Sequence, residues 1–148
     1  MDGFDRKILK LVQENNLQTH QSIGNKVGLS ASAVRKRLVA LRESGIIAAD
    51  VSLLRPDASQ VQIVVTVIFQ DASTEAHDQF ESLIQSTPQI MQAYHVSGEE
   101  DYIIILHCPS LDWYEKWNLT ALVANPFIRS FNSRVVWSRK KYATAQPV

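Results

Sequence analysis

The sequence contains a single cysteine, Cys108, among its 148 residues. One thiol cannot form an intrachain disulfide, which fits a protein of the reducing cytoplasm. No apolar run approaches the roughly 18 residues of a membrane-spanning helix, and the charged start of the chain argues against a signal peptide. Glycine and proline are scarce, at five each, and no segment is of low complexity. We therefore expect a soluble globular protein.

Sequence motifs for catalysis and metal binding are also lacking. There is no Gly-rich phosphate loop, Gly-x-Ser-x-Gly turn, Ser-His-Asp set or Cys-x-x-Cys pair. Of the candidate ligands His95, His107 and Cys108, the last two are adjacent on a predicted strand, so they point to opposite faces and cannot readily share one ion. We therefore expect no catalytic residues, no metal and no cofactor.

The net charge of zero is unevenly distributed. Residues 1–60 hold nine Lys+Arg and six Asp+Glu, a net of +3, whereas residues 61–148 hold six and nine, a net of −3. Four of the cations lie between Gly28 and Ile47, with Glu43 as the one acid. This stretch is therefore the first place to look for an anionic partner.

Three short helices are predicted before this stretch ends. Apolar residues recur at i, i+4, i+7 and i+8 from Phe4, with Asp2 as the N-cap. A second helix follows Thr19 and ends at Gly28. The third follows Ser30 as its N-cap and ends at Gly45, and an extended, wing-like segment is expected after it.

The third predicted helix has an apolar and a basic face. Its inward stripe consists of Val34, Leu38 and Leu41. Its outward face carries Ser32, Arg35, Lys36 and Val39, flanked by Arg37 and Arg42. A basic helix after a tight turn is typical of a helix-turn-helix, but also of the solvated face of an ordinary three-helix bundle. The small Ser32 at the helix start favours double-stranded DNA as the partner, with these predicted contacts: Ser30, Ser32, Ala33, Arg35, Lys36, Arg37 and Arg42.

The remaining chain predicts an α+β domain after a linker at residues 55–60. Strands are expected at residues 61–70, 90–97, 101–108 and 128–138, and helices after Ser73 and at residues 111–125. This order is ferredoxin-like, with both helices on one face of an antiparallel sheet. The first and third strands are apolar on both sides, so a second copy should cover the open face in a homodimer. Trp113 and Trp117 are expected in the core, because the second helix is apolar on most sides.

Four segments resemble the Lrp/AsnC (leucine-responsive/asparagine-type) transcriptional regulators over nearly the whole chain. They are "FDRKILKLVQEN", "VGLSASAVRKRLVALRESGII", "VSGEEDYIIIL" and "VVWSRKKYATAQPV". The resemblance implies a winged helix-turn-helix at residues 1–54 and a βαββαβ effector-binding and oligomerisation domain at residues 61–148. It also implies regulation of amino-acid metabolism, a small amino-acid effector, and dimers that can assemble into octamers. Ala48 and Ala49 depart from the Gly-Tyr usual in the family, and Gln60–Gln62 replaces a segment that often contains glycine.

The resemblance also indicates an effector site. In the family a G-x-x-D-aromatic turn lines a pocket between dimers, and the matching residues are Gly98, Asp101 and Tyr102. Backbone N–H groups around Ser97–Glu99 suit a carboxylate, and the side chain of Asp101 suits an ammonium group. Taken alone, the turn is equally typical of a plain hairpin with a positive-φ glycine. With the resemblance we expect the pocket, and the residues expected beside it are Ser97, Glu99 and Ser133.

Two other functions stay open at this point. One is a sirohaem-decarboxylase-like enzyme on the same scaffold, which would need basic and histidine residues around a tetrapyrrole cavity. The other is a sensory module that has lost DNA binding. The basic residues gather on the third helix and the histidines are scattered, which favours the regulator.

Overall fold

The computed structural model describes residues 1–54, 57 and 59–148. The chain forms two compact units: Met1–Leu54 together with Lys140–Val148, and Arg55–Arg139. The last nine residues therefore group with the first unit, whereas the sequence analysis placed them in the second domain. The side chain of Gln13 holds them there, since it donates to the carbonyl of Gln146 and accepts from its N–H. Of the predicted linker, residues 55, 56 and 58 lie outside the described part of the chain.

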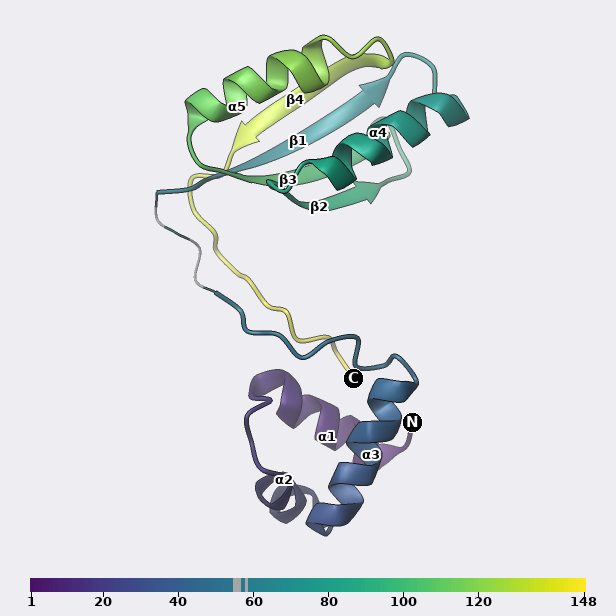
Figure 1. Cartoon of the computed structure of the whole chain (residues 1–148), viewed down its shortest axis with the longest axis vertical. Coiled ribbons are helices and arrows are strands. Elements are labelled where there is room, and N and C mark those ends of the chain that lie inside the picture. Colours follow the sequence, from purple (N-terminus) through teal and green to yellow (C-terminus); the bar gives the residue numbers. More distant parts are fainter. Residues whose placement is uncertain (55–56, 58) are drawn as a thin grey trace. The chain divides into compact units, whose positions relative to one another are not determined.

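The first unit is built from three helices: α1 (Gly3–Glu14), α2 (His20–Val27) and α3 (Ala31–Glu43) (Figure 1). The predicted N-caps are confirmed, because the side chains of Asp2, Thr19 and Ser30 each accept a backbone N–H of their helix. Gly28 ends α2 at φ +77°, a left-handed conformation that glycine adopts without steric cost. The core of the unit consists of Ile8, Ile23, Val27, Val34 and Leu38.

The expected wing is absent from the segment that follows α3. Residues 46–54 form neither helix nor strand. Ile47 instead turns back, with its N–H donated to the carbonyl of Leu41 at 3.0 Å and its side chain packed on the helical core. A strand needs a neighbour for its backbone groups, and none of the described residues 1–54 or 140–148 is a strand that could pair with it.

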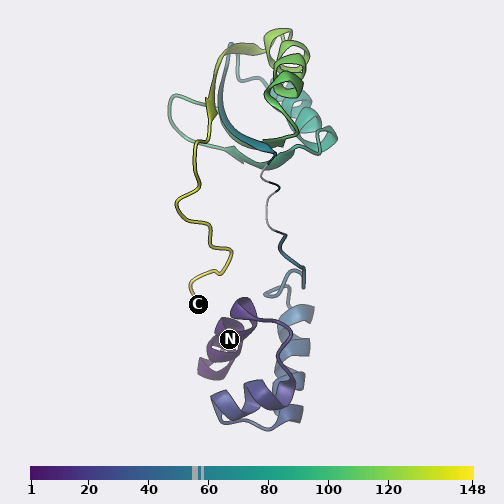
Figure 2. The same ribbon diagram turned by 90° about the vertical axis from the view of Figure 1, so that its left-hand side faces the viewer.

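The second unit has the predicted α+β order. Its elements are β1 (Val61–Phe69), α4 (Thr74–Ser86), β2 (Ile90–His95), β3 (Tyr102–Cys108), α5 (Leu111–Asn118), a π-helical turn (Leu119–Val123) and β4 (Ile128–Val135). The strands form an antiparallel sheet in the order β2-β3-β1-β4. Both helices cover one face of this sheet and leave the other face bare (Figures 1 and 2). The ferredoxin-like prediction is confirmed.

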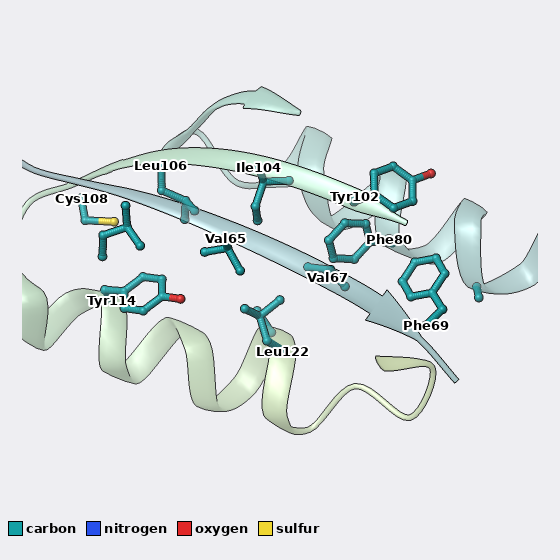
Figure 3. Packing of buried hydrophobic residues seen from close by; sticks show 13 residues of the cluster. Val65, Val67, Phe69, Phe80, Tyr102, Ile104, Leu106, Cys108, Tyr114 and Leu122 are labelled. Atoms are coloured by element: carbon teal, nitrogen blue, oxygen red, sulfur yellow. The ribbon is translucent and has the colours of Figure 1, made fainter. Parts of the chain in front are cut away.

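The core of this unit lies between the sheet and its two helices. Every second residue of β3 is buried, and Tyr102, Ile104, Leu106 and Cys108 point to the helices (Figure 3). The alternation follows from the pleat of a strand, which directs successive side chains to opposite faces. Half-buried side chains therefore occupy the bare face, among them Val64, Ile68, Ile103 and Ile105.

The helix expected at residues 111–125 differs from the prediction. Its regular part ends at Asn118 and continues as a π-helical turn. Trp113 and Trp117 are only half-buried, and Leu119 is 55% exposed. A helix that packs on one face of a sheet can bury only one stripe, so an apolar composition all round did not make it a core helix.

Candidate nucleic-acid interface and effector site

Helix α3 presents the predicted basic face to solvent. Val34, Leu38 and Leu41 are buried as predicted, which turns Ser32, Arg35 and Lys36 outward. Within the described part of the chain, Arg35 and Lys36 have no hydrogen-bond or ion-pair partner. Two adjacent cations on an exposed helix face are available to an anionic ligand.

The start of α3 is held by a short hydroxyl network. Ser30 Oγ accepts the N–H of Ala33 at 3.2 Å and lies 3.0 Å from Ser32 Oγ. Ser32 is exposed, whereas Ala33 is half-buried. Of the predicted contacts at this end, Ser32 is thus the one with an exposed polar side chain on the basic face.

Two of the predicted DNA contacts on α3 form ion pairs with acidic residues of this chain. Arg37 Nη1 lies 2.8 Å from Asp2 and 2.7 Å from Asp5, on α1 and its N-cap. Arg42 forms a bidentate pair with Asp50, at 2.9 and 3.2 Å, and this pair lowers the pKa of Asp50. Spacing within α3 could not reveal either partner, because both lie on other segments.

Val39 is a surface residue that the predicted contact set leaves out. It is four positions after Arg35 on the same face and 44% exposed. An apolar side chain beside cations suits the methyl group of thymine in a major groove. The signal was present in the sequence, since helical spacing already put Val39 on the basic face.

The turn between α2 and α3 depends on close backbone packing at Gly24. A Cβ at this position would collide with the carbonyl oxygen of Leu29, and the N–H groups of Gly28 and Leu29 both donate to the carbonyl of Gly24. Only glycine fits such an approach without a shift of the backbone. The turn sets the angle at which α3 leaves α2.

The hairpin between β2 and β3 carries most of the predicted effector residues. Ser97, Gly98 and Glu99 are exposed, and Gly98 has φ +130°. Asp101 is already engaged, since its carboxylate accepts the N–H of Phe69 at 2.7 Å and its own N–H is donated to the carbonyl of Val67. Asp101 therefore ties the hairpin to the end of β1, and its other carboxylate oxygen has no hydrogen bond within the described part of the chain.

Tyr102 follows the hairpin and connects it to α4. Its hydroxyl donates to Glu81 and lies 3.0 Å from His77 Nδ1, while His95 stacks on its ring. Burial and, after it, the bond to Glu81 raise the pKa of Tyr102 to about 12, so the phenol stays protonated. In Figure 3 this hydroxyl points away from the aliphatic core.

Tyr102 also lines a hollow of about 870 Å³ between α4 and β2. The lining residues are Asp78, Glu81, Ser82, Ile84, Gln85, Ser86, Ala93, His95 and Tyr102. Acidic and other polar side chains line it together with the apolar Ile84 and Ala93, so it is more polar than most small-molecule sites. None of the other predicted effector residues lines this hollow.

Ser133 does not join the hairpin. It lies on β4, opposite Val65 of β1, and its hydroxyl is hydrogen-bonded to that of Tyr114 on α5. Strand β1 separates β4 from β3, so Ser133 belongs to a different part of the sheet from Tyr102. Within this subunit Ser133 therefore lies apart from Gly98 and Asp101, which residue spacing could not show because it carries no information on strand order.

Other polar candidates form no site among the residues the structure describes. No group of three His, Cys, Asp or Glu side chains there could hold a metal ion. Cys108 is buried, which raises the pKa of its thiol to about 11. No helix in the described ranges is long and apolar enough to cross a membrane.

Two family profiles match the chain. Residues 1–48 match a winged helix-turn-helix DNA-binding domain, and residues 62–146 match the Lrp/AsnC ligand-binding domain. The chain belongs to the Lrp/AsnC family of transcriptional regulators. It is a regulator with a DNA-binding helix-turn-helix and a small-ligand-binding domain, and it is not an enzyme. The family interpretation made from the sequence is confirmed.

Relatives and solved structures agree with this assignment. An HTH-type transcriptional regulator of Sinorhizobium fredii is 35% identical over all of this chain and 89% of its own length. A transcriptional regulator of Neisseria meningitidis in complex with L-Met superimposes with a TM-score of 0.91 at 25% identity, over 99% of this chain and 96% of that one. An AsnC family regulator of Agrobacterium tumefaciens gives a TM-score of 0.90 at 28% identity, over 99% and 97%.

Proposed function

We propose that this Lrp/AsnC regulator controls genes of amino-acid metabolism and changes its DNA binding when a small amino acid binds the second unit. The observation that carries the DNA-binding half is the outward face of α3, where Arg35 and Lys36 have no hydrogen-bond or ion-pair partner among the residues that the structure describes. A helix of this kind fits a major groove, with cations on phosphates and Ser32 and Val39 at base edges.

The effector half rests on the hairpin and the adjoining hollow. Exposed backbone at Ser97–Glu99 suits a carboxylate, and the free oxygen of Asp101 suits an ammonium group. The side chain of the amino acid would then lie near Tyr102 and the hollow between α4 and β2. The L-Met complex of the Neisseria meningitidis relative supports an amino acid as the ligand class.

A homodimer is the proposed working unit. The bare face of the sheet carries Val64, Ile68, Ile103 and Ile105, whose apolar surface a second copy would cover. Dimers would present two α3 helices to successive half-sites, and further assembly toward an octamer would place hairpins of neighbouring dimers together. Ile105→Glu should yield monomers in light scattering, because it buries a charge in that interface. A wild-type protein of 16.7 kDa in solution would contradict the proposal.

The decisive experiment measures DNA affinity with and without amino acids. A duplex is selected from a random pool by the wild-type protein, and the twenty amino acids are screened by thermal shift, since a ligand of the folded state raises its stability. The stabilising amino acid should change DNA affinity by roughly 5–150-fold. The double change Arg35→Ala and Lys36→Ala should abolish specific binding. Unchanged affinity in that variant would show that Arg35 and Lys36 on α3 do not contact the DNA, and loss of DNA binding by the wild type itself would leave only the sensory module.

A matched variant separates the two halves of the proposal. Asp101→Asn keeps an oxygen that can accept the N–H of Phe69 and removes the charge offered to an ammonium group. It should lose the amino-acid response in isothermal titration while its DNA affinity without effector stays at the wild-type value. Equal amino-acid affinity in the two proteins would place the site elsewhere.

A further inference from the structure

Arg37 is the one cation in the middle of α3 that turns back toward α1. Its guanidinium lies between the carboxylates of Asp2 and Asp5 and 5.5 Å from the centre of the Phe4 ring. Its side chain is 31% exposed, and that of Asp5 is 15% exposed. The group therefore sits at the junction of two helices rather than in open solvent.

The two carboxylates share their oxygens between two tasks. Asp2 Oδ1 accepts the N–H groups of Phe4 and Asp5, and Asp5 Oδ2 accepts the N–H of Asp2, which together cap α1. The remaining oxygens, Asp2 Oδ2 and Asp5 Oδ1, both accept from Arg37 Nη1. All four oxygens are used, so the cap of α1 and the middle of α3 form one connected cluster.

The charge of this cluster decides between two roles for Arg37. Two carboxylates surround one guanidinium, so the three side chains together carry a net negative charge. A phosphate that approached Arg37 would meet both acids within 2.8 Å of the same nitrogen. Arg35 and Lys36, two positions and one position earlier, have no such neighbours among the described residues.

We propose that Arg37 is a positioning residue, which fixes α3 against the N-terminus of α1 and thereby sets the angle of the DNA-contacting face, and that it is not a phosphate ligand. This inference rests on the proposed DNA-binding function of α3. A helix held at its working angle before binding loses less conformational freedom on the DNA, which raises affinity without any contact.

Salt dependence of DNA binding distinguishes positioning from phosphate contact. Each phosphate contact adds about one to the slope of log affinity against log salt. Lys36→Gln should therefore lower the slope by about one, whereas Arg37→Gln should weaken binding roughly threefold to tenfold at an unchanged slope. Arg37→Lys, which keeps a cation with several donors, should recover part of the loss. A slope lowered by Arg37→Gln as much as by Lys36→Gln would overturn the proposal.

Removing the charge of Asp5, an acidic partner of Arg37, should change DNA affinity in opposite directions for the two roles. If Arg37 positions α3, Asp5→Asn should also weaken DNA binding, and the double variant with Arg37→Gln should bind no more weakly than Arg37→Gln alone. If Arg37 contacts phosphate, Asp5→Asn frees the guanidinium and tightens binding, which contradicts the proposal. Asp2→Asn, at the more exposed acid, is a second variant of the same kind should Asp5→Asn fail to fold.

Unfolding measurements on the DNA-free protein distinguish a failure of the Arg37 proposal from a failure of the proposed function. DNA affinities are measured well below the unfolding temperature of each variant. A variant that is less stable but binds DNA as tightly as the wild type would show that the Arg37–Asp5 ion pair only stabilises the fold, which would overturn the proposal that Arg37 positions α3. If the wild type binds no DNA, the proposed function fails. Arg37 and Asp5 are then compared in a double-mutant cycle of unfolding midpoints, where additive effects would refute the cluster itself.

Discussion

The DNA-binding unit and the effector unit differ in how much apolar surface they bury. Among the described residues, seven apolar side chains are buried in the DNA-binding unit, five of them in the core of α1–α3, whereas thirteen fill the space between the sheet and its helices. The smaller unit relies in proportion more on helix caps, on the glycines of its turns and on the Arg37 cluster. A small core leaves local backbone chemistry with a larger share of the stability.

The largest expected effect comes from the core of the effector unit. Phe80→Ala removes a fully buried ring and should cost about 3–5 kcal/mol of unfolding free energy. All three tryptophans lie in residues 113–137, so tryptophan fluorescence in a urea titration follows this unit. Ile23→Ala is the matched change in the other core, and it should lower the helical signal in circular dichroism with little effect on the fluorescence transition. If Phe80→Ala and Ile23→Ala shifted the fluorescence transition equally, the two units would unfold as one, and the contrast between their cores would not hold.

The next effect concerns the turn between α2 and α3. Gly24→Ala should destabilise the DNA-binding unit by about 1–3 kcal/mol, because the new methyl group collides with backbone that cannot move aside. Gly3→Ala is the control, since no atom lies within 4 Å of a Cβ built there. Thermal unfolding by far-UV circular dichroism measures both. A Gly24→Ala protein as stable as Gly3→Ala would show that this turn is loose.

A loss of stability at alkaline pH is expected in the effector unit. The pKa of Tyr102 is raised to about 12, so the unfolded chain loses this proton first as pH rises above 10. Tyr102 should therefore lower the unfolding free energy by about 1 kcal/mol by about pH 11, in addition to the loss from Cys108, whose thiol pKa is also raised. Tyr102→Phe should reduce this alkaline loss, and the buried Tyr114, whose pKa is also raised, should retain a part of it. An identical pH dependence in Tyr102→Phe and wild type would contradict the assignment.

The smallest effect is assigned to residues 140–148. Their removal should lower the unfolding free energy of the DNA-binding unit by roughly 0.5–1 kcal/mol, the usual worth of a hydrogen bond or two at a surface. Gln13→Ala should reproduce most of this change in circular dichroism. If the removal instead lowered the stability that tryptophan fluorescence reports for the effector unit, residues 140–148 would belong to the second domain, as predicted from the sequence.

Features that depend on near neighbours could be predicted from the sequence. The caps at Asp2, Thr19 and Ser30 bind backbone two or three residues away, so residue type and position suffice to identify them. The order of strands and helices follows from periodicity in the same way. The missing wing and the exposed Leu119 were not predictable, because each depends on what another segment does or does not cover.

The same distinction between near and distant neighbours in the chain applies to the candidate sites. Helical spacing by itself determined that Ser32, Arg35, Lys36 and Val39 share one face of α3, since a helix repeats every 3.6 residues whatever surrounds it. Only the tertiary structure decided that Arg37 binds the acids at the start of α1, that Asp101 holds the end of β1, and that Ser133 faces Tyr114. The physical reason is that these partners lie 19 or more residues apart in the chain, and a charge or hydroxyl satisfied at that distance looks, in the sequence, identical to a free one.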